Sequence, residues 1–187
     1  EAFLYDVFDA AGPTPATTAV LNEKLKNEIE TRIVSMWNGH DDDGEGASIK
    51  YFGRLRPAVS LLTLNTESDA FTDDWKTAVE LVKGAALLWH SSSISIETSD
   101  YADRKVFKDR PGIGWMLYLP KVLTAQQVPE ARSLVPVLGV DKKQIGTIVI
   151  SVTDEPFSDE NPEHIRIANA IEIRLVDQDL LPRYTDL

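Results

Sequence analysis

The clearest hydrophobic pattern of the chain lies between residues 75 and 89. Apolar residues recur there every three or four positions, which is the spacing of one face of an α-helix. Thr72 can cap this helix, and Asp73 and Asp74 suit the positive end of its dipole. The predicted inner face consists of Trp75, Val79, Val82, Ala86 and Trp89.

A second helix is predicted to begin at Asn161-Pro162. Asparagine is a favoured N-cap, and proline is favoured at the first helical position, where its missing N–H costs nothing. The same spacing of three and four then continues to residue 175. The predicted inner face consists of His164, Ile167, Ala168, Ile171 and Leu175.

Two further helices are predicted from shorter patterns. One extends from Thr18 to Trp37 and ends before Gly39, a natural helix stop. The other is short and lies within residues 123–132. The stripe that predicts the longer helix consists of Leu21, Leu25, Ile29, Ile33 and Met36 or Trp37.

Runs rich in β-branched and aromatic residues between the helices predict strands. They cover residues 1–8, 48–52, 58–65, 93–98, 113–119, 134–138 and 145–152. Runs of strands separated by helices predict an α+β class, a two-layer fold with a mostly antiparallel or mixed sheet covered by helices on one face. We expect residues 1–187 to form a single domain.

The most distinctive segment is Arg110–Pro120, which contains Pro-Gly-Ile-Gly-Trp followed by Met-Leu-Tyr-Leu. It joins a glycine-containing turn to an apolar strand and offers no group for nucleophilic or metal chemistry. Gly112 and Gly114 do not match a phosphate-binding loop, because such loops lead from a strand into a helix. We therefore expect this segment to stabilise the fold.

Charge is the property of the composition that most restricts function. The chain has 30 acidic and 19 basic residues, and its formal net charge is −11. Such a surface repels nucleic-acid phosphates, which proteins bind through Lys and Arg. It attracts a basic protein partner and speeds the encounter with it, unless the charge serves solubility alone. We expect no direct contact with nucleic acid.

Other residue types indicate the cellular compartment and exclude several kinds of site. The chain has no cysteine, which excludes disulfides and thiolate metal sites and favours a reducing compartment. No apolar run approaches the roughly 18 residues that cross a bilayer. The histidines His40, His90 and His164 lie on separate predicted elements without metal-ligand spacing. We expect a cytoplasmic protein that uses no membrane, metal or cofactor.

An acidic loop follows the first predicted helix. Its consecutive aspartates do not match a calcium-binding loop, which alternates its ligands and ends on a glutamate at the twelfth position. The loop is therefore either a solvated segment or a contact surface for a basic partner, and an exposed tryptophan beside it is a good binding anchor. The candidate contact residues are Trp37, Asp41, Asp42, Asp43 and Glu45.

A second acidic group precedes the last helix and consists of Asp154, Glu155, Asp159 and Glu160, with His164 following. Carboxylates beside a histidine can perform general acid–base chemistry, so a hydrolase of unrecognised type is the alternative function. The simpler interpretation is that these carboxylates compensate the positive end of the helix dipole. The chain has no Gly-x-Ser-x-Gly motif, and we expect no catalytic residues.

Four segments of the C-terminal half occur in a specific order: Arg110–Pro120, Gly146–Ile150, Phe157–His164 and Leu180–Pro182. This order resembles the Immunity protein 52 family of bacterial polymorphic-toxin and type VI secretion systems. Trp75, Leu87 and the strand at Ser95–Glu97 are also similar to that family. The resemblance spans roughly residues 3–182, and residues 41–57 carry no signature of the family.

The resemblance implies an antidote that neutralises a cognate secreted toxin by binding it, without catalysis. The implied partner is a nuclease toxin with a restriction-endonuclease-like fold that cuts DNA. The acidic charge complements the basic surface with which a nuclease binds DNA. The resemblance also implies that Gly112, Gly114, Trp115 and Pro162 determine the fold.

Overall fold

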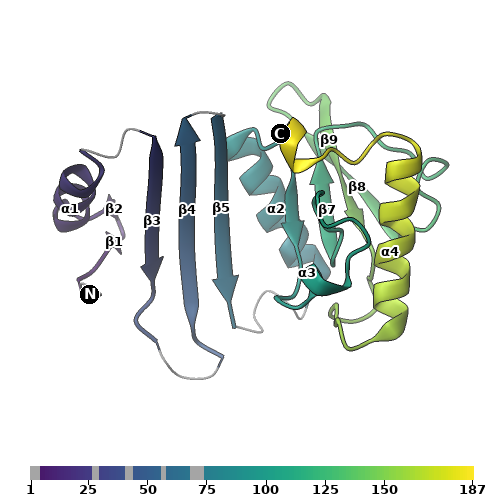
Figure 1. The fold of residues 1–187 in the computed structure, drawn as a ribbon, viewed down its shortest axis with the longest axis horizontal. Coiled ribbons are helices and arrows are strands. Elements are labelled where there is room, and N and C mark those ends of the chain that lie inside the picture. The colour runs from purple at the N-terminus through teal and green to yellow at the C-terminus, as the bar shows by residue number, and fades with distance from the viewer. Residues whose placement is uncertain (1–4, 27–29, 41–43, 56–57, 68–73) are drawn as a thin grey trace. The chain divides into compact units, whose positions relative to one another are not determined.

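A computed structural model describes residues 5–26, 30–40, 44–55, 58–67 and 74–187 of the chain (Figure 1). Their contacts group into two compact units, Glu1–Asp69 and Ala70–Leu187. The described residues form four α-helices and three sheets, all antiparallel, which confirms the predicted α+β class. A single domain over residues 1–187 stays a prediction.

The N-terminal unit opens with a small hairpin and a helix. Strand β1 (Phe8–Asp9) pairs with β2 (Gly12–Pro13), and α1 (Pro15–Leu25) follows directly. Thr14 caps this helix, because its side chain accepts a hydrogen bond from the backbone N–H of Thr17 at 3.2 Å.

The helix predicted from Thr18 to Trp37 is wrong in its second half. Helix α1 ends at Leu25, and β3 (Thr31–Trp37) is a strand. The apolar residues of this segment fit helical spacing, but Thr31, Ile33 and Val34 are β-branched and prefer extended backbone. Pairing with a neighbouring strand along seven residues stabilises the strand.

The main sheet of the N-terminal unit has the order β3-β4-β5. Strands β4 (Ala47–Leu55) and β5 (Ala58–Thr66) confirm two predicted strands. Few residues of this unit are buried: among those whose burial the structure describes, they are Thr17, Val34 and Gly53.

The C-terminal unit is built on a four-stranded sheet with the order β6-β7-β9-β8. Its strands are β6 (Ile94–Ile96), β7 (Met116–Leu119), β8 (Ser133–Leu138) and β9 (Gln144–Ile150). Every residue of β7 and residues 146–150 of β9 are buried, on both faces of the sheet. Central strands that are apolar on both faces require cover on both sides.

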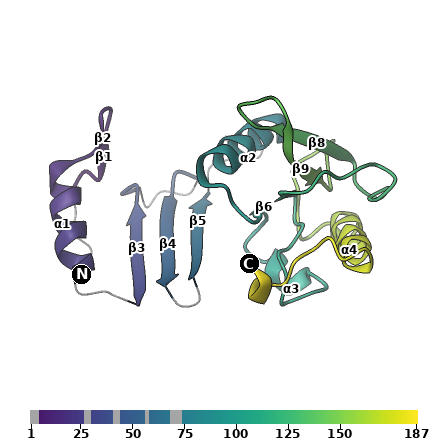
Figure 2. The same cartoon turned by 90° about the horizontal axis from the view of Figure 1, so that it is seen from above.

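Two helices provide this cover. Figure 2 shows α2 (Trp75–Trp89) and α4 (Pro162–Asp177) on opposite sides of the four-stranded sheet. This sheet is therefore covered on two faces, whereas the sequence led us to expect one. Helix α4 buries the whole predicted face. Helix α2 buries Val79, Val82 and Ala86, but Trp89 at its last turn is exposed.

The remaining elements are short. Helix α3 (Tyr101–Arg104) and the 3₁₀ helix η2 (Tyr184–Asp186) are not among the predicted elements. Residues 125–127 form only a turn, so the helix predicted within residues 123–132 is wrong. Pro129 explains the difference, because a proline disfavours helical backbone at the residue before it.

Candidate functional site

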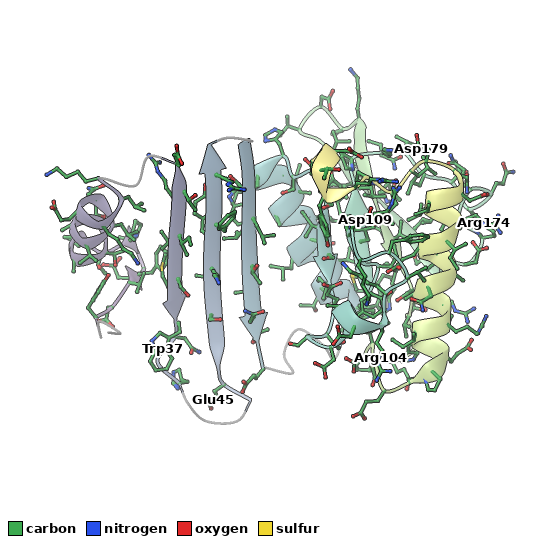
Figure 3. All side chains as sticks on the ribbon, viewed as in Figure 1. Trp37, Glu45, Arg104, Asp109, Arg174 and Asp179 are labelled. Carbon is green, nitrogen blue, oxygen red and sulfur yellow. The ribbon has the colours of Figure 1, made fainter. Side chains whose placement is uncertain are left out.

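The candidate contact residues that the structure describes lie at one end of the three-stranded sheet. Strand β3 ends at Trp37 and β4 begins at Ala47, and Figure 3 places Trp37 and Glu45 at this shared end. Trp37 is 41% exposed, and Glu45 is exposed as well. Asp41, Asp42 and Asp43 lie outside the described residues. The indole and at least one carboxylate are thus accessible from the same end.

Asn38 organises the hairpin loop between these strands. Its side-chain amide donates to the backbone carbonyl of Glu45 at 2.6 Å. Its side-chain oxygen accepts from the backbone N–H groups of Ala47 at 3.1 Å and His40 at 3.3 Å. The sequence analysis missed this residue, although asparagine in front of a glycine is a common signal for a turn held by its side chain.

The hairpin loop carries more acidic than basic side chains. His40 Nδ1 lies 3.3 Å from Glu45 Oε2, and both side chains are more than half exposed. Exposed ion pairs contribute little to stability because water screens them. With Asp41, Asp42 and Asp43 in the same loop of the sequence, one histidine offsets only part of the acidic charge.

The second acidic group surrounds His164 and holds it in place. Nε2 of His164 lies 2.9 Å from Glu155 Oε1, and Nδ1 accepts from the backbone N–H of Ser158 at 3.1 Å. The ring is almost fully buried and stacks on Phe157 with ring centroids 5.7 Å apart. Since both ring nitrogens are engaged, His164 has no free nitrogen with which to take a proton from a substrate.

The other carboxylates of this group do not converge on the histidine. Asp159 accepts from the hydroxyl of Thr98 at 2.8 Å, whereas Asp154 and Glu160 are exposed. Asn161 caps α4 by accepting from the backbone N–H of Glu163 at 3.0 Å. Within the described part of the chain, no group of three or more His, Asp or Glu could hold a metal ion. The arrangement anchors the start of α4.

The Gly112–Trp115 turn packs tightly against the β6 segment. Gly114 has a φ of +46°, and a Cβ there would lie 2.9 Å from the carbonyl oxygen of Ile96. A Cβ on Gly112 would lie 2.5 Å from a carboxylate oxygen of Glu97. Position 114 therefore requires glycine, whereas a side chain at position 112 would have to displace the end of the Glu97 side chain.

Trp115 follows this turn and lies in the core, 4% exposed. Its Nε1–H donates to the carbonyl of Val152 at 3.0 Å, which satisfies the polar end of the buried indole. Ser151 donates to the carbonyl of Gly114 at 2.7 Å, so β9 and the turn are joined by side-chain hydrogen bonds as well. These contacts support the role in the fold that we assign to Gly112, Gly114 and Trp115.

A buried carboxylate, Glu172 of α4, lies beneath the same turn and is 1% exposed. It accepts hydrogen bonds from the Tyr101 hydroxyl at 2.8 Å and from the backbone N–H groups of Val106 at 2.8 Å and Ile113 at 3.2 Å. Burial and the nearby Glu172 raise the pKa of Tyr101. The sequence analysis missed Glu172, although it lies four residues after Ala168 and three before Leu175, on the predicted inner face.

None of the described helices is long and apolar enough to cross a membrane. In the described geometry, an exposed indole and an exposed carboxylate lie at one end of the three-stranded sheet, and a buried core lies in the other unit. The family model of Immunity protein 52 matches residues 8–183, and the chain belongs to this family. The match runs through residues 41–57, where the sequence analysis found no signature. A comparison with curated proteins gives no significant match.

Membership in this family implies that the chain neutralises a cognate toxin protein by binding it. Immunity proteins are typically non-catalytic inhibitors, which agrees with a histidine whose two nitrogens are already engaged. The alternative of a hydrolase built around His164 is therefore set aside.

Proposed function

We propose that this chain neutralises a secreted antibacterial nuclease toxin of a polymorphic-toxin or type VI secretion system. The chain acts in the cytoplasm of the cell that makes the toxin, as a protein–protein inhibitor. The toxin has a restriction-endonuclease-like fold and cuts DNA. The family supports an inhibitor of a toxin, and the acidic charge of the chain supports a toxin that binds nucleic acid.

The observation that carries this proposal is the exposed indole beside an acidic loop. A nuclease binds DNA through a basic surface, and an acidic partner is attracted to the same surface. Carboxylates of Asp41, Asp42, Asp43 and Glu45 take the place of DNA phosphates in the toxin's groove. Trp37 provides the aromatic anchor that often dominates such interfaces. DNA is then excluded from the groove.

The test is reversal of charge in the hairpin. The variant Asp42→Lys with Glu45→Lys is compared with Glu80→Lys and Asp154→Lys, which changes net charge by the same amount at two exposed positions outside the hairpin. We expect the hairpin variant to lower the association rate with the toxin by about tenfold or more at low salt and to weaken its salt dependence. The matched pair should have a much smaller effect, as measured by stopped-flow kinetics and calorimetry.

Unchanged affinity and unchanged salt dependence in the hairpin variant would refute the hairpin as the contact. A DNA-cleavage assay with the toxin encoded beside this chain tests the function itself. Stoichiometric wild-type chain should abolish cleavage. If the toxin binds but has no activity on DNA, the nuclease proposal fails while the family assignment stands.

A further inference from the structure

The two faces of the three-stranded sheet differ in composition: one carries two adjacent apolar rows, whereas the other carries one such row, Ile33, Phe52 and Leu61, between rows that contain polar residues. Neighbouring residues along a strand point to opposite faces, and residues paired across strands point to the same face. Val34, Tyr51 and Leu62 form one row across the sheet, and Met36, Ile49 and Leu64 form the next row on the same side. These six residues, which we call the docking face, are all apolar or aromatic.

Side-chain contacts agree with this assignment of faces. The Tyr51 hydroxyl lies 3.3 Å from Ser60 Oγ, and the Tyr51 ring lies over Gly53. Gly53 and Ser60 are paired across β4 and β5, so all three residues share one face. On the opposite face, Asn65 donates to Ser48 at 3.5 Å, and these two residues are also paired.

Exposure of the docking face increases across the sheet. Val34 on β3 is 8% exposed, whereas Leu62 and Leu64 on β5 are 40% and 52% exposed. Scattered apolar residues are ordinary on a surface, but two adjacent rows of them form a contiguous patch of the kind that binds a partner.

Charge identifies the kind of partner. Glu45 and Glu67 are exposed at the hairpin end of the sheet, where the Glu67 backbone N–H donates to the Gly46 carbonyl at 2.9 Å. Arg32 lies near the opposite end of the docking face. Residues 1–69 carry 12 acidic and 6 basic side chains, so a second copy of this chain would bring the same excess of negative charge. A partner with an apolar patch bordered by Lys and Arg compensates this charge.

We propose that the cognate toxin docks on this face with an apolar patch bordered by basic side chains, while its groove receives the acidic hairpin. This inference rests on the proposed function, because it assigns the surface to the same partner. Trp37 points to the opposite face from the docking face, so the toxin reaches around the hairpin end of the sheet. A specific interface of about 800 Å² per partner is larger than six side chains, so the hairpin and the face are used together.

Adjacent leucines of β5 provide a matched test. Leu62 and Leu64 belong to the docking face, whereas Leu61 points to the other face and is more exposed, at 58% against 40% and 52%. We expect Leu62→Ser with Leu64→Ser to weaken toxin binding at least about tenfold, as is usual when central apolar anchors are removed. Leu61→Ser should change the Kd by less than about threefold. If the double variant fails to fold, Leu64→Ser alone is compared with Leu61→Ser.

Three outcomes overturn the inference. Equal effects of the Leu61 and Leu62/Leu64 variants would show that the faces do not differ in binding. A loss of stability in the free protein with unchanged toxin affinity would show that the docking face is packed within the chain. A wild-type dimer in sedimentation that the double variant disrupts, again with unchanged toxin affinity, would assign the face to a second copy. If the wild-type chain itself does not bind the toxin, the proposed function fails first.

Discussion

The two units of this chain use apolar residues in opposite ways. In the C-terminal unit, β7 is buried along its whole length and a contiguous core includes Trp115, Ile171 and Leu175. In the N-terminal unit, Leu61, Leu62 and Leu64 of β5 are exposed, and so are Ile33, Trp37 and Tyr51 of the neighbouring strands. The apolar pattern therefore predicts strands in both units, whereas burial distinguishes a strand that builds a core from one that can bind a partner.

Replacing one tryptophan in each unit should give the largest difference in effect between the two units. Trp115→Ala should lower the free energy of unfolding by about 3–5 kcal/mol, because it removes a buried indole. Trp37→Ala should change it by less than about 1 kcal/mol and weaken toxin binding instead. Urea denaturation and calorimetry with the toxin separate the two effects. A stable Trp115→Ala variant that cannot bind toxin would place Trp115 in the interface.

Removing the buried carboxylate of α4 should have the next largest effect. Glu172→Ala leaves the Tyr101 hydroxyl and two backbone N–H groups without their acceptor, and we expect a loss of about 3 kcal/mol. Glu160→Ala, an exposed glutamate before the same helix, is the control and should change stability by less than about 0.5 kcal/mol. Similar urea midpoints for the two variants would show that Glu172 is not needed to hold the turn.

Substitution in the glycine turn tests the backbone of the C-terminal unit. Gly114→Ala should cost about 1–3 kcal/mol, since alanine is strained at a φ of +46° and its Cβ approaches the backbone of β6. Gly84→Ala should instead stabilise by about 0.5–1 kcal/mol, because Gly84 is exposed within α2 with open space around it. Thermal unfolding measures both, and a stabilising Gly114→Ala would contradict the geometry of the turn.

The smallest expected effect is on the stability of the fold at acid pH. Hydrogen bonds from Arg174 hold the pKa of Glu130 below its usual range, with Glu130 Oε1 2.7 Å from Arg174 NH2 (Figure 3 labels Arg174 on α4). A carboxyl whose pKa is lower in the folded state contributes stability above its unfolded pKa of about 4, and this stability is lost as pH falls below it. Glu130→Gln should therefore show a shallower loss of stability between about pH 5 and pH 3.

The pH series needs a matched carboxylate on the same unit. Glu80→Gln removes an exposed glutamate that pairs with Lys83 three residues along α2. Urea midpoints at each pH for both variants, compared with the wild type, isolate the pair of Glu130 with Arg174. If the urea midpoint falls with decreasing pH in the same way for Glu130→Gln and for the wild type, the pair contributes nothing to the pH dependence of stability.

The sequence predicted the parts of the fold that rest on local signals. Asn161 and Pro162 mark the start of α4 because capping chemistry is local, and the run of β-branched residues within residues 145–152 marked β9. The strand at residues 31–37 was missed, because Ile29 and Ile33 fit helical spacing and only pairing with β4 decides the outcome. Sheet cover on two faces was also missed, since it depends on contacts between distant segments.

The sequence shows which residue types the candidate site contains, but not the contacts that these residues make. The acidic run and Trp37 are visible in the sequence, and their position at a strand end follows from the hairpin that joins β3 to β4. The loop-closing contacts of Asn38 and the docking face were not predicted, because residues 18–37 were assigned to a helix. A register between three strands is needed before Leu62 and Leu61 can be placed on opposite faces.

Hydrogen exchange of the chain with and without its toxin tests the central claim most directly. We predict that toxin binding slows exchange in residues 31–40, 44–55 and 58–67. Exchange in β7 and β9 should change little, because the backbone of these strands is already paired and buried. Slower exchange confined to the C-terminal unit, with none in the three-stranded sheet, would contradict the assignment of recognition to the N-terminal unit.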